Sequence, residues 1–307
     1  MIPSHPRTGP VPVINAMTID VEDWFQVYAF TGAVPRQAWD GMMRRVEANT
    51  DLILHQLADH KIHATFFTLG WIAERHPALI RRIVASGHEL ASHGWDHTRA
   101  DHQSPEAFRA DVRRTRRVLE DLGGVPVIGY RAATFSLGPQ NLWAFSILES
   151  EGYQYSSSIY PVRHDNYGVP DAPRWPFKPG PGSLWELPMT TIRLAGRNLP
   201  CSGGGYFRLL PYRAFRFGLA HVNRTERQPG IFYFHPWEID PGQPRIRAAS
   251  RLSRFRHYVN LSRTEPRLRR LMRDFAWDRM DRVFGHLLKP ESREGAAPGQ
   301  FSNPAMA

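Results

Sequence analysis

Two histidines four residues apart, His93 and His97, are the residues whose types and spacing most directly suggest chemistry. Imidazole is the commonest protein ligand of transition metals, and two rings at this spacing can close on one ion from a helix or from a tight loop. The chain holds 14 histidines, so chance pairs are expected, and the alternative is a pair of solvated or capping side chains. The interpretation as a metal site therefore depends on which residues accompany the pair.

Acidic residues follow the first apolar run of the chain. Residues 11–19 have the pattern of a buried strand, and Asp20, Glu22 and Asp23 come directly after it. Barrel enzymes place their chemistry at the carboxyl ends of such strands. The alternative for one of the three carboxylates is to cap the helix that follows.

Three later apolar runs also end in polar side chains. The run at 88–92 leads into His93, the run at 125–130 into Arg131, and the run at 231–234 into His235. In a barrel these strand ends meet on one face. Together they contain what a metal-dependent hydrolase needs: two histidines and a carboxylate as ligands, a second carboxylate as base, an arginine to orient it, and a distant histidine as acid.

Strand and helix patterns alternate along the first 160 residues. A further strand is expected over 63–69, and helices are expected over 41–60, 72–85, 105–122 and 141–151. This alternation predicts an α/β fold with a parallel sheet or barrel. From 161 to 187 prolines and glycines interrupt the pattern around Trp175 and Trp185, which is more typical of a functional surface than of a core.

The composition excludes several classes of protein. The single cysteine, Cys201, forbids an internal disulfide and a cysteine-based zinc cluster, and it fits a reducing compartment.

Residues 1–12 lack the apolar core of a secretory signal and no run of about 18 apolar residues occurs, so we expect a cytoplasmic protein without a membrane span. The net charge is +10, yet no zinc finger or RNP-like strand is present, so we expect no nucleic-acid partner. Nothing in the sequence indicates an oligomeric state.

The segment from 245 to 282 is basic and helical in pattern. Its arginines outnumber its acidic residues by about three to one. Apolar residues recur between them at helical intervals: Leu252, Phe255, Tyr258, Leu268, Leu271 and Phe275. Such a stripe favours packing on the parent domain over a helix that lies on a membrane, and either leaves an arginine-rich face that could contact an anionic membrane. We expect the segment to be dispensable for the chemistry.

Five stretches, in this order, resemble the polysaccharide deacetylases of carbohydrate esterase family 4. They are Thr18-Ile19-Asp20-Val21-Glu22-Asp23-Trp24-Phe25, His63-Ala64-Thr65-Phe66-Phe67, Ser92-His93-Gly94-Trp95-Asp96-His97, Gly129-Tyr130-Arg131-Ala132 and Phe232-Tyr233-Phe234-His235-Pro236-Trp237-Glu238. Within the family, the chain resembles the subgroup that is found with exosortase-type exopolysaccharide clusters and carries a C-terminal extension. The resemblance runs from about Asn15 to about Arg282, and the combination of motifs is highly specific.

The resemblance implies an architecture. We expect a distorted, incomplete (β/α) barrel of the seven-stranded type over residues 13–240, with the irregular aromatic insertion inside it. A basic helical extension at 241–289 is expected to pack on the barrel, with disordered ends at 1–12 and 290–307.

Carried over position by position, the resemblance also implies roles. Asp20 matches the catalytic base, Arg131 the arginine that holds the base, and His235 the general acid. His93 and His97 match the ligands of a divalent metal, most often zinc, with cobalt or nickel as alternatives. The commonest family motif has a second aspartate on the metal where Val21 stands here, so Glu22 is the favoured third ligand and Asp23 the alternative.

Substrate contacts are expected from the aromatic residues of these motifs: Trp24, Trp95, Tyr130 and Trp237. After Arg131, Ala132-Ala133-Thr134 replace the usual Pro-Tyr-Gly, so we expect a groove of different shape.

The activity implied is metal-dependent hydrolysis of N-acetyl groups from amino-sugar units of a polysaccharide or a lipid-linked exopolysaccharide precursor, with release of acetate. One alternative is a hydrolase of a small cyclic amide or ureide, since allantoinase-like relatives share the motifs. The other is a non-catalytic sugar-binding or assembly protein on the same scaffold. The chain retains all five catalytic and metal-binding residues of the motifs, which argues against the non-catalytic protein. The long aromatic insertion favours an extended polymer substrate over a small cyclic amide or ureide.

Overall fold

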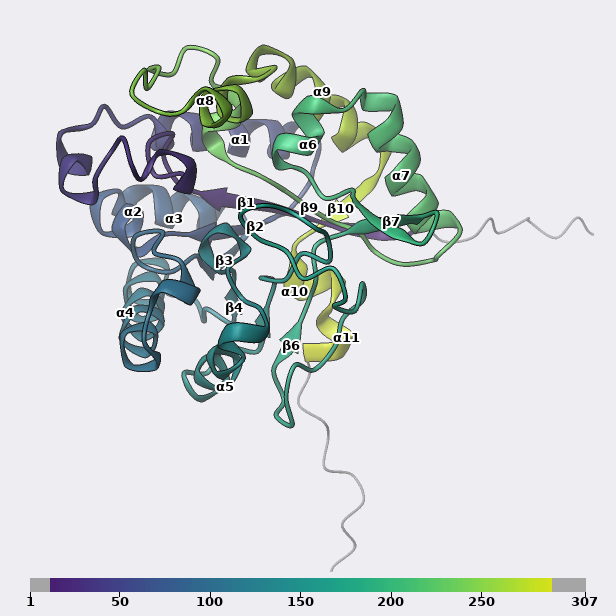
Figure 1. The fold of residues 1–307 in the computed structure, drawn as a ribbon, viewed down its shortest axis with the longest axis horizontal. Coiled ribbons are helices and arrows are strands. Elements are labelled where there is room, and N and C mark those ends of the chain that lie inside the picture. The colour runs from purple at the N-terminus through teal and green to yellow at the C-terminus, as the bar shows by residue number, and fades with distance from the viewer. Residues whose placement is uncertain (1–11, 289–307) are drawn as a thin grey trace, which may run out of the picture.

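A central parallel sheet curls through the molecule, and helices surround it (Figure 1). The structure is a computed structural model that describes residues 12–288. In Figure 1, α8 and α9 lie above the strands and α4 and α5 below them. The segments expected to be disordered, 1–12 and 290–307, lie outside the described residues except for residue 12.

Seven strands build the barrel, as the sequence predicts. Six of them are parallel neighbours in chain order, and the seventh, β9, pairs with β1. Their bounds are β1 Ile14–Val21, β2 Thr65–Thr68, β3 Glu89–Ser92, β4 Gly129–Tyr130, β5 Tyr155–Ser156, β6 Trp185–Glu186 and β9 Ile231–Phe234. No ladder joins β6 to β9 within residues 12–288, so the barrel is incomplete. The expected distorted, incomplete (β/α) barrel is therefore confirmed.

Helices return the chain between the parallel strands, as such a sheet requires. They are α1 Val46–Asp59, α2 Gly70–Arg75, α3 Pro77–Ala85, α4 Pro105–Gly123, α5 Trp143–Ser150, α6 Gly204–Leu209 and α7 Tyr212–Arg224. Short 3₁₀ turns lie at Tyr28–Phe30, Arg36–Gly41, Ala100–His102, Ala133–Phe135, Pro139–Asn141 and Pro236–Ile239. The Ser104 side chain caps the start of α4, and Gly124, with φ 65°, ends it in the left-handed conformation that glycine adopts most easily.

Before the C-terminal segment, the structure departs from the predicted elements at a divided helix and at an additional hairpin. The single helix expected over 72–85 is two helices, because Pro77 lacks an N–H and disfavours helical geometry at His76. An antiparallel hairpin, β7 Thr191–Leu194 and β8 Arg197–Pro200, follows the insertion and was not expected.

The C-terminal segment packs on the barrel and also extends its sheet. It contains α8 Arg251–Tyr258, α9 Leu261–Asp274, β10 Ala276–Asp278, α10 Met280–Val283 and α11 Gly285–Leu288. β10 pairs in parallel with the first residues of β1, so the sheet has eight strands in all. Leu268 and Leu271 of α9 are fully buried, whereas Leu252 and Phe255 of α8 are 54% and 56% exposed. Tyr258 and Phe275 also pack against the core, so four of the six stripe residues dock and two face outward.

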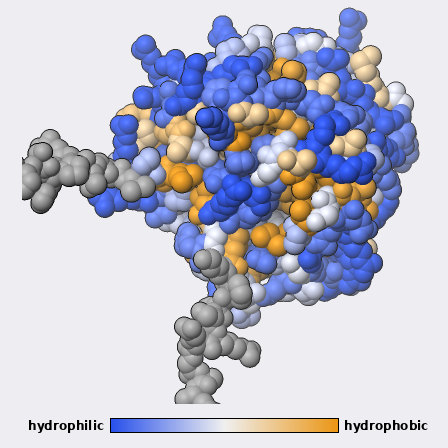
Figure 2. Space-filling model, turned by 180° about the vertical axis from the view of Figure 1, so that it is seen from behind, coloured by the Kyte–Doolittle hydropathy of each residue, from blue (hydrophilic) through white to orange (hydrophobic). Residues whose placement is uncertain are grey.

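The outer surface is largely polar. Figure 2 shows the face opposite to that of Figure 1, where hydrophilic residues cover most of the area and apolar side chains form smaller areas between them. Among the helices of residues 12–288, none has the length and apolarity needed to cross a bilayer.

If the C-terminal segment is part of the core, removing its central aromatic side chain should destabilise the whole domain. Trp277 of β10 is 7% exposed, packs on Phe232 and donates from Nε1 to the Leu271 carbonyl at 3.1 Å. We expect Trp277→Ala to lower the free energy of unfolding by about 3–5 kcal/mol, measured by guanidinium denaturation. Leu194→Ala, at a side chain that is 61% exposed, is the control and should change it by less than about 0.5 kcal/mol.

Candidate active site

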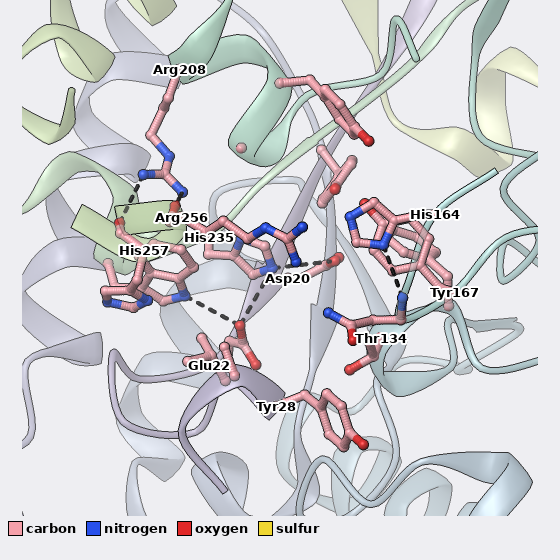
Figure 3. A pocket seen from close by; sticks show the side chains of 18 of the residues that line it. Asp20, Glu22, Tyr28, Thr134, His164, Tyr167, Arg208, His235, Arg256 and His257 are labelled. Carbon is pink, nitrogen blue, oxygen red and sulfur yellow. Dashed lines mark hydrogen bonds and ion pairs between the residues drawn. The ribbon is translucent and has the colours of Figure 1, made fainter. Parts of the chain in front are cut away.

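A cavity of about 390 Å³ opens at the carboxyl ends of the strands (Figure 3). Five of the residues predicted from the motifs line it: Asp20, Glu22, His93, His97 and His235. Asp20 lies in β1, and His93 and His235 come directly after β3 and β9. Because parallel strands end at the same edge of a sheet, residues far apart in the sequence meet here.

Glu22, His93 and His97 form a compact group of metal-ligating side chains. One ligand atom from each lies within 4.8 Å of the other two. Asp20, in β1, and Glu22, just after it, both line the cavity, while Val21 between them is buried in the core.

The chemistry of this group fits a divalent metal. The Arg131 carbonyl lies 2.8 Å from Nδ1 of His93, so the proton of a neutral ring belongs on Nδ1 and the Nε2 lone pair is left for a ligand. Burial lowers the pKa of both histidines, that of His97 to about 4, which keeps the rings neutral. His97 Nδ1 is buried without a hydrogen-bond partner among the described residues, and His97 Nε2 lies 3.0 Å from Glu22 Oε2. Two neutral imidazoles and a carboxylate form a donor set that zinc prefers.

Asp23 lies at the start of α1, outside this group. Its Oδ2 accepts N–H bonds from Arg45 at 2.8 Å and Val46 at 3.1 Å, and its Oδ1 accepts one from Trp24. These bonds satisfy donors that the first turn of a helix leaves unpaired. The sequence allowed one of the three carboxylates to cap the following helix, and the structure places Asp23 in that position. Glu22 is the carboxylate that lies beside the histidines.

Asp20 and Arg131 form a buried ion pair behind the cavity wall. Arg131 Nη1 donates to Asp20 Oδ1 at 2.6 Å and to Thr18 Oγ1 at 2.8 Å, and Arg131 is fully buried. Burial opposes ionisation of Asp20, but the Arg131 guanidinium together with the nearby His93 and His235 rings outweighs it and holds the pKa of the carboxyl below its usual value. Asp20 is thus an oriented, ionised carboxylate, as a general base must be.

His235 faces two carboxylates, Asp20 in β1 and Glu22 just after that strand. Its Nε2 lies 3.3 Å from Glu22 Oε1 and 3.9 Å from Asp20 Oδ2. Burial alone would lower the pKa of His235, but Glu22, Glu238 and Asp20 together raise it to about 9. The ring therefore carries a proton beside the site, as a general acid does.

Two residues that contact the candidate site were not singled out from the sequence, Glu238 and Arg208. Glu238 Oε1 lies 2.7 Å from His235 Nδ1, and Glu238 Oε2 accepts from Arg208 Nε at 2.6 Å. A glutamate three residues after a candidate acid in the same matched stretch was a usable signal. Arg208 gave none, because only the packing of α6 brings it to the site.

The predicted aromatic contacts divide into one that reaches the cavity and three that do not. Trp237 lines the cavity and stacks on His235 at 5.0 Å. The other three are buried in the core, where Trp24 bonds to the Met43 carbonyl, Trp95 lies under the Arg114 guanidinium, and Tyr130 packs on Phe108. These side chains stabilise the loops that carry the motifs and do not line the cavity.

The irregular insertion does reach the cavity, through other residues than its tryptophans. His164, Asn166 and Tyr167 line the cavity, and the rings of His164 and Tyr167 stack at 3.9 Å. Trp175 and Trp185 lie outside the lining and pack against Arg174 and Lys178. An aromatic wall therefore exists where the sequence indicated a functional surface, but a histidine and a tyrosine form it.

The stretch that departs from the family motif also lines the cavity, at Ala132 and Thr134. Thr134 has φ 55° and His97 has φ 60°, a left-handed conformation that is uncommon for residues other than glycine. Such strain persists where surrounding structure enforces it, which is frequent at functional sites.

Comparison with known families divides the chain into two parts. Residues 38–155 match the polysaccharide deacetylase family, and residues 157–285 match a domain of unknown function, DUF3473. The first match contains His93, His97 and Arg131, whereas the second contains Arg208 and His235. The cavity is therefore assembled from both parts and from Asp20 and Glu22, which precede the first match.

Curated relatives are deacetylases of amino-sugar polymers. A chitooligosaccharide deacetylase of Sinorhizobium fredii is 50% identical over 100 residues, which cover 32% of this chain and 44% of that protein. The peptidoglycan-N-acetylglucosamine deacetylase PgdA of Listeria monocytogenes is 33% identical over 72 residues, covering 24% of this chain and 16% of that protein. The chain thus spans less than half of the length of these relatives. Together with the family match, they show that the chain contains a polysaccharide deacetylase domain.

Solved structures share the fold over nearly the whole chain. A candidate polysaccharide deacetylase from Mycobacterium smegmatis is 19% identical with a TM-score of 0.57, covering 99% of both chains. PuuE allantoinase is 16% identical with a TM-score of 0.57, covering 93% of both chains. At these identities the likeness concerns the fold.

The ligand group generates a prediction on metal content. The purified chain should hold about one divalent ion, and His93→Ala or His97→Ala should lose it, because each removes one of three converging donors. Asp23→Asn should keep the ion, since Asp23 bonds to the start of α1, and His55→Ala, at an exposed histidine of that helix, is the control. Elemental analysis checks this, and full occupancy in both of the first two variants would remove the pair from the site.

Proposed function

We propose that this deacetylase domain hydrolyses N-acetyl groups on amino-sugar units of a polysaccharide or of a lipid-linked exopolysaccharide precursor, in a metal-dependent reaction that releases acetate. One observation carries the proposal: an ionised Asp20, held by buried Arg131, faces the same cavity as the Glu22, His93 and His97 group. A base beside a metal-ligating group is the arrangement that amide hydrolysis by water requires.

The chain's own residues account for the proton transfers. A divalent metal held by Glu22, His93 and His97 would act as a Lewis acid toward the acetyl carbonyl. Asp20 has Oδ1 occupied by Arg131, so Oδ2, which faces His235 at 3.9 Å, is the atom that takes a proton from the attacking water. His235 donates its Nε2 proton to the departing nitrogen, because an amine leaves poorly unless it is protonated. The products are acetate and a free amine on the sugar.

The walls of the cavity suit a saccharide. Aromatic side chains line it from separate elements: Tyr28, Phe135, Tyr167, Tyr206, Tyr233 and Trp237. Aromatic faces pack against the apolar faces of sugar rings while polar edges find hydrogen-bond partners. The named relatives act on chitooligosaccharide and on peptidoglycan N-acetylglucosamine, which supports an N-acetylated amino sugar.

One rim of the cavity is apolar and basic, which supports a lipid-linked form of the substrate. Leu209, Leu252 and Phe255 line the cavity and are each more than half exposed. From Arg245 to Arg256 the chain has five arginines and no acidic residue. Apolar tips within a basic surface are typical of contact with anionic lipid, and we propose that this rim meets the membrane peripherally. The resemblance of the motifs supports assignment to the exosortase-associated subgroup, and the second matched domain supports a C-terminal part beyond the deacetylase match.

The proposed activity is tested by acetate release from N-acetylglucosamine and N-acetylgalactosamine oligomers. Asp20→Asn should lower kcat by about 10²–10⁴-fold, because an amide cannot accept the proton, and should keep the metal. Arg174→Lys, in an ion pair with Glu226 that lies outside the cavity lining, is the control and should retain activity. Turnover of allantoin without acetate release would favour the ureide hydrolase, and bound sugar with no turnover would favour the non-catalytic protein.

The rim generates a prediction on membrane association. We expect the chain to co-sediment with vesicles that contain anionic lipid, and to dissociate as salt rises, since each basic residue near the surface contributes about 1 kcal/mol and salt screens it. Phe255→Ser should weaken this association, whereas Leu194→Ser, at an exposed leucine of the β7–β8 hairpin, should not. Equal, salt-independent recovery on neutral and anionic vesicles would contradict the membrane contact.

A further inference from the structure

The guanidinium of Arg208 connects the C-terminal segment to the wall of the active site (Figure 3). Its Nε donates to Glu238 Oε2 at 2.6 Å. Its other donors reach three carbonyls at the end of α8, those of Arg256 at 3.0 Å, His257 at 2.7 Å and Val259 at 2.9 Å. Arg208 is only 2% exposed, so these four partners fix both the position and the plane of the group.

Helix physics explains why α8 ends at this arginine. The last carbonyls of an α-helix have no partner within the helix, and the terminus carries partial negative charge. Basic side chains stabilise such an end when they donate to its carbonyls. Arg208, which belongs to α6, has this role for α8, so the orientation of the guanidinium depends on a helix that begins more than 40 residues later.

From Arg208 the contact continues to the candidate acid. Glu238 is 1% exposed, and its Oε1 lies 2.7 Å from Nδ1 and 3.1 Å from the backbone N of His235. An acceptor on Nδ1 fixes the ring plane and leaves Nε2 directed at Asp20 and Glu22. Because a buried carboxylate needs compensation, the Arg208 charge keeps Glu238 ionised in this place.

A second contact joins the same elements by ring stacking. The His257 ring, from α8, stacks on Trp237 at 4.1 Å with 15° between the planes, and Trp237 stacks on His235 at 5.0 Å with 20°. His257 Nε2 bonds to Gln243 Oε1 at 2.7 Å, which holds the ring in position. Three consecutive rings thus extend from the C-terminal segment to His235.

We propose that the C-terminal segment positions the general acid, with Arg208 and Glu238 as positioning residues for His235. The proposal rests on the proposed deacetylase function, and it gives a role to residues in the domain of unknown function, which contains Arg208, Glu238 and His257. It also replaces the expectation that the segment is dispensable for the chemistry.

The test compares two compounds that differ in their need for an acid. An N-acetylglucosamine oligomer must leave as a protonated amine, whereas 4-nitrophenyl acetate releases a phenolate that needs no proton. Arg208→Lys keeps the charge but cannot reach four partners, and Glu238→Gln keeps the shape but loses the charge. We expect each to lower kcat on the oligomer by about 10²-fold, the low end of the range for general acid catalysis, with KM and metal content unchanged. The rate on the ester should change by less than about 3-fold.

The rates on the oligomer and on the ester, together with the metal content, also identify the control result and the results that would contradict the proposal. Arg174→Lys alters an ion pair of similar kind outside the cavity and should leave both rates unchanged. Equal losses on the amide and the ester, or loss of the metal, would make Arg208 and Glu238 structural residues and overturn the proposal, as would an unchanged kcat on the oligomer. If the unmodified chain cleaves the ester and not the oligomer, the proposed function itself fails, and the assignment of an acid fails with it.

Discussion

The buried ion pair between Arg131 and Asp20 is the interaction on which the site depends. Arg131 has no exposed surface, so its charge must be compensated inside the protein, and Asp20 does so at 2.6 Å. The same arginine donates from Nε to the Ser157 carbonyl, and its own carbonyl accepts from His93. One residue therefore ties together the ends of β1, β4 and β5 and sets the tautomer of a metal-ligating histidine.

The C-terminal segment contributes to the structure in two places, once to the central sheet and once to the wall of the cavity. Near its end, β10 extends the sheet beside β1, and nearer its start, α8 forms one wall of the cavity. The segment beyond residue 240 therefore shares both the sheet and the cavity of the barrel. A segment that shares both the sheet and the cavity with the barrel cannot be removed without affecting each.

The sequence predicted the barrel and most of the site because both depend on local patterns: short buried runs that end in polar residues. It favoured Glu22 over Asp23 as the third ligand but could not settle the choice, because that depends on the hydrogen bonds of Asp23 at the start of α1. Three-residue β10 was too short to give a pattern. Arg208 was invisible for another reason: its partners are backbone carbonyls of α8, whose identities leave no trace in the sequence.

Anomalous diffraction at the zinc edge, from crystals of the chain grown with zinc, tests the central claim most directly. We predict a single strong peak within coordination distance of the Glu22 carboxylate and of the His93 and His97 rings. The Asp20 carboxylate should remain on Arg131. A peak at Asp23 or elsewhere on the surface, with none between Glu22 and the two histidines, would contradict the assignment of this cavity as a metal-dependent active site.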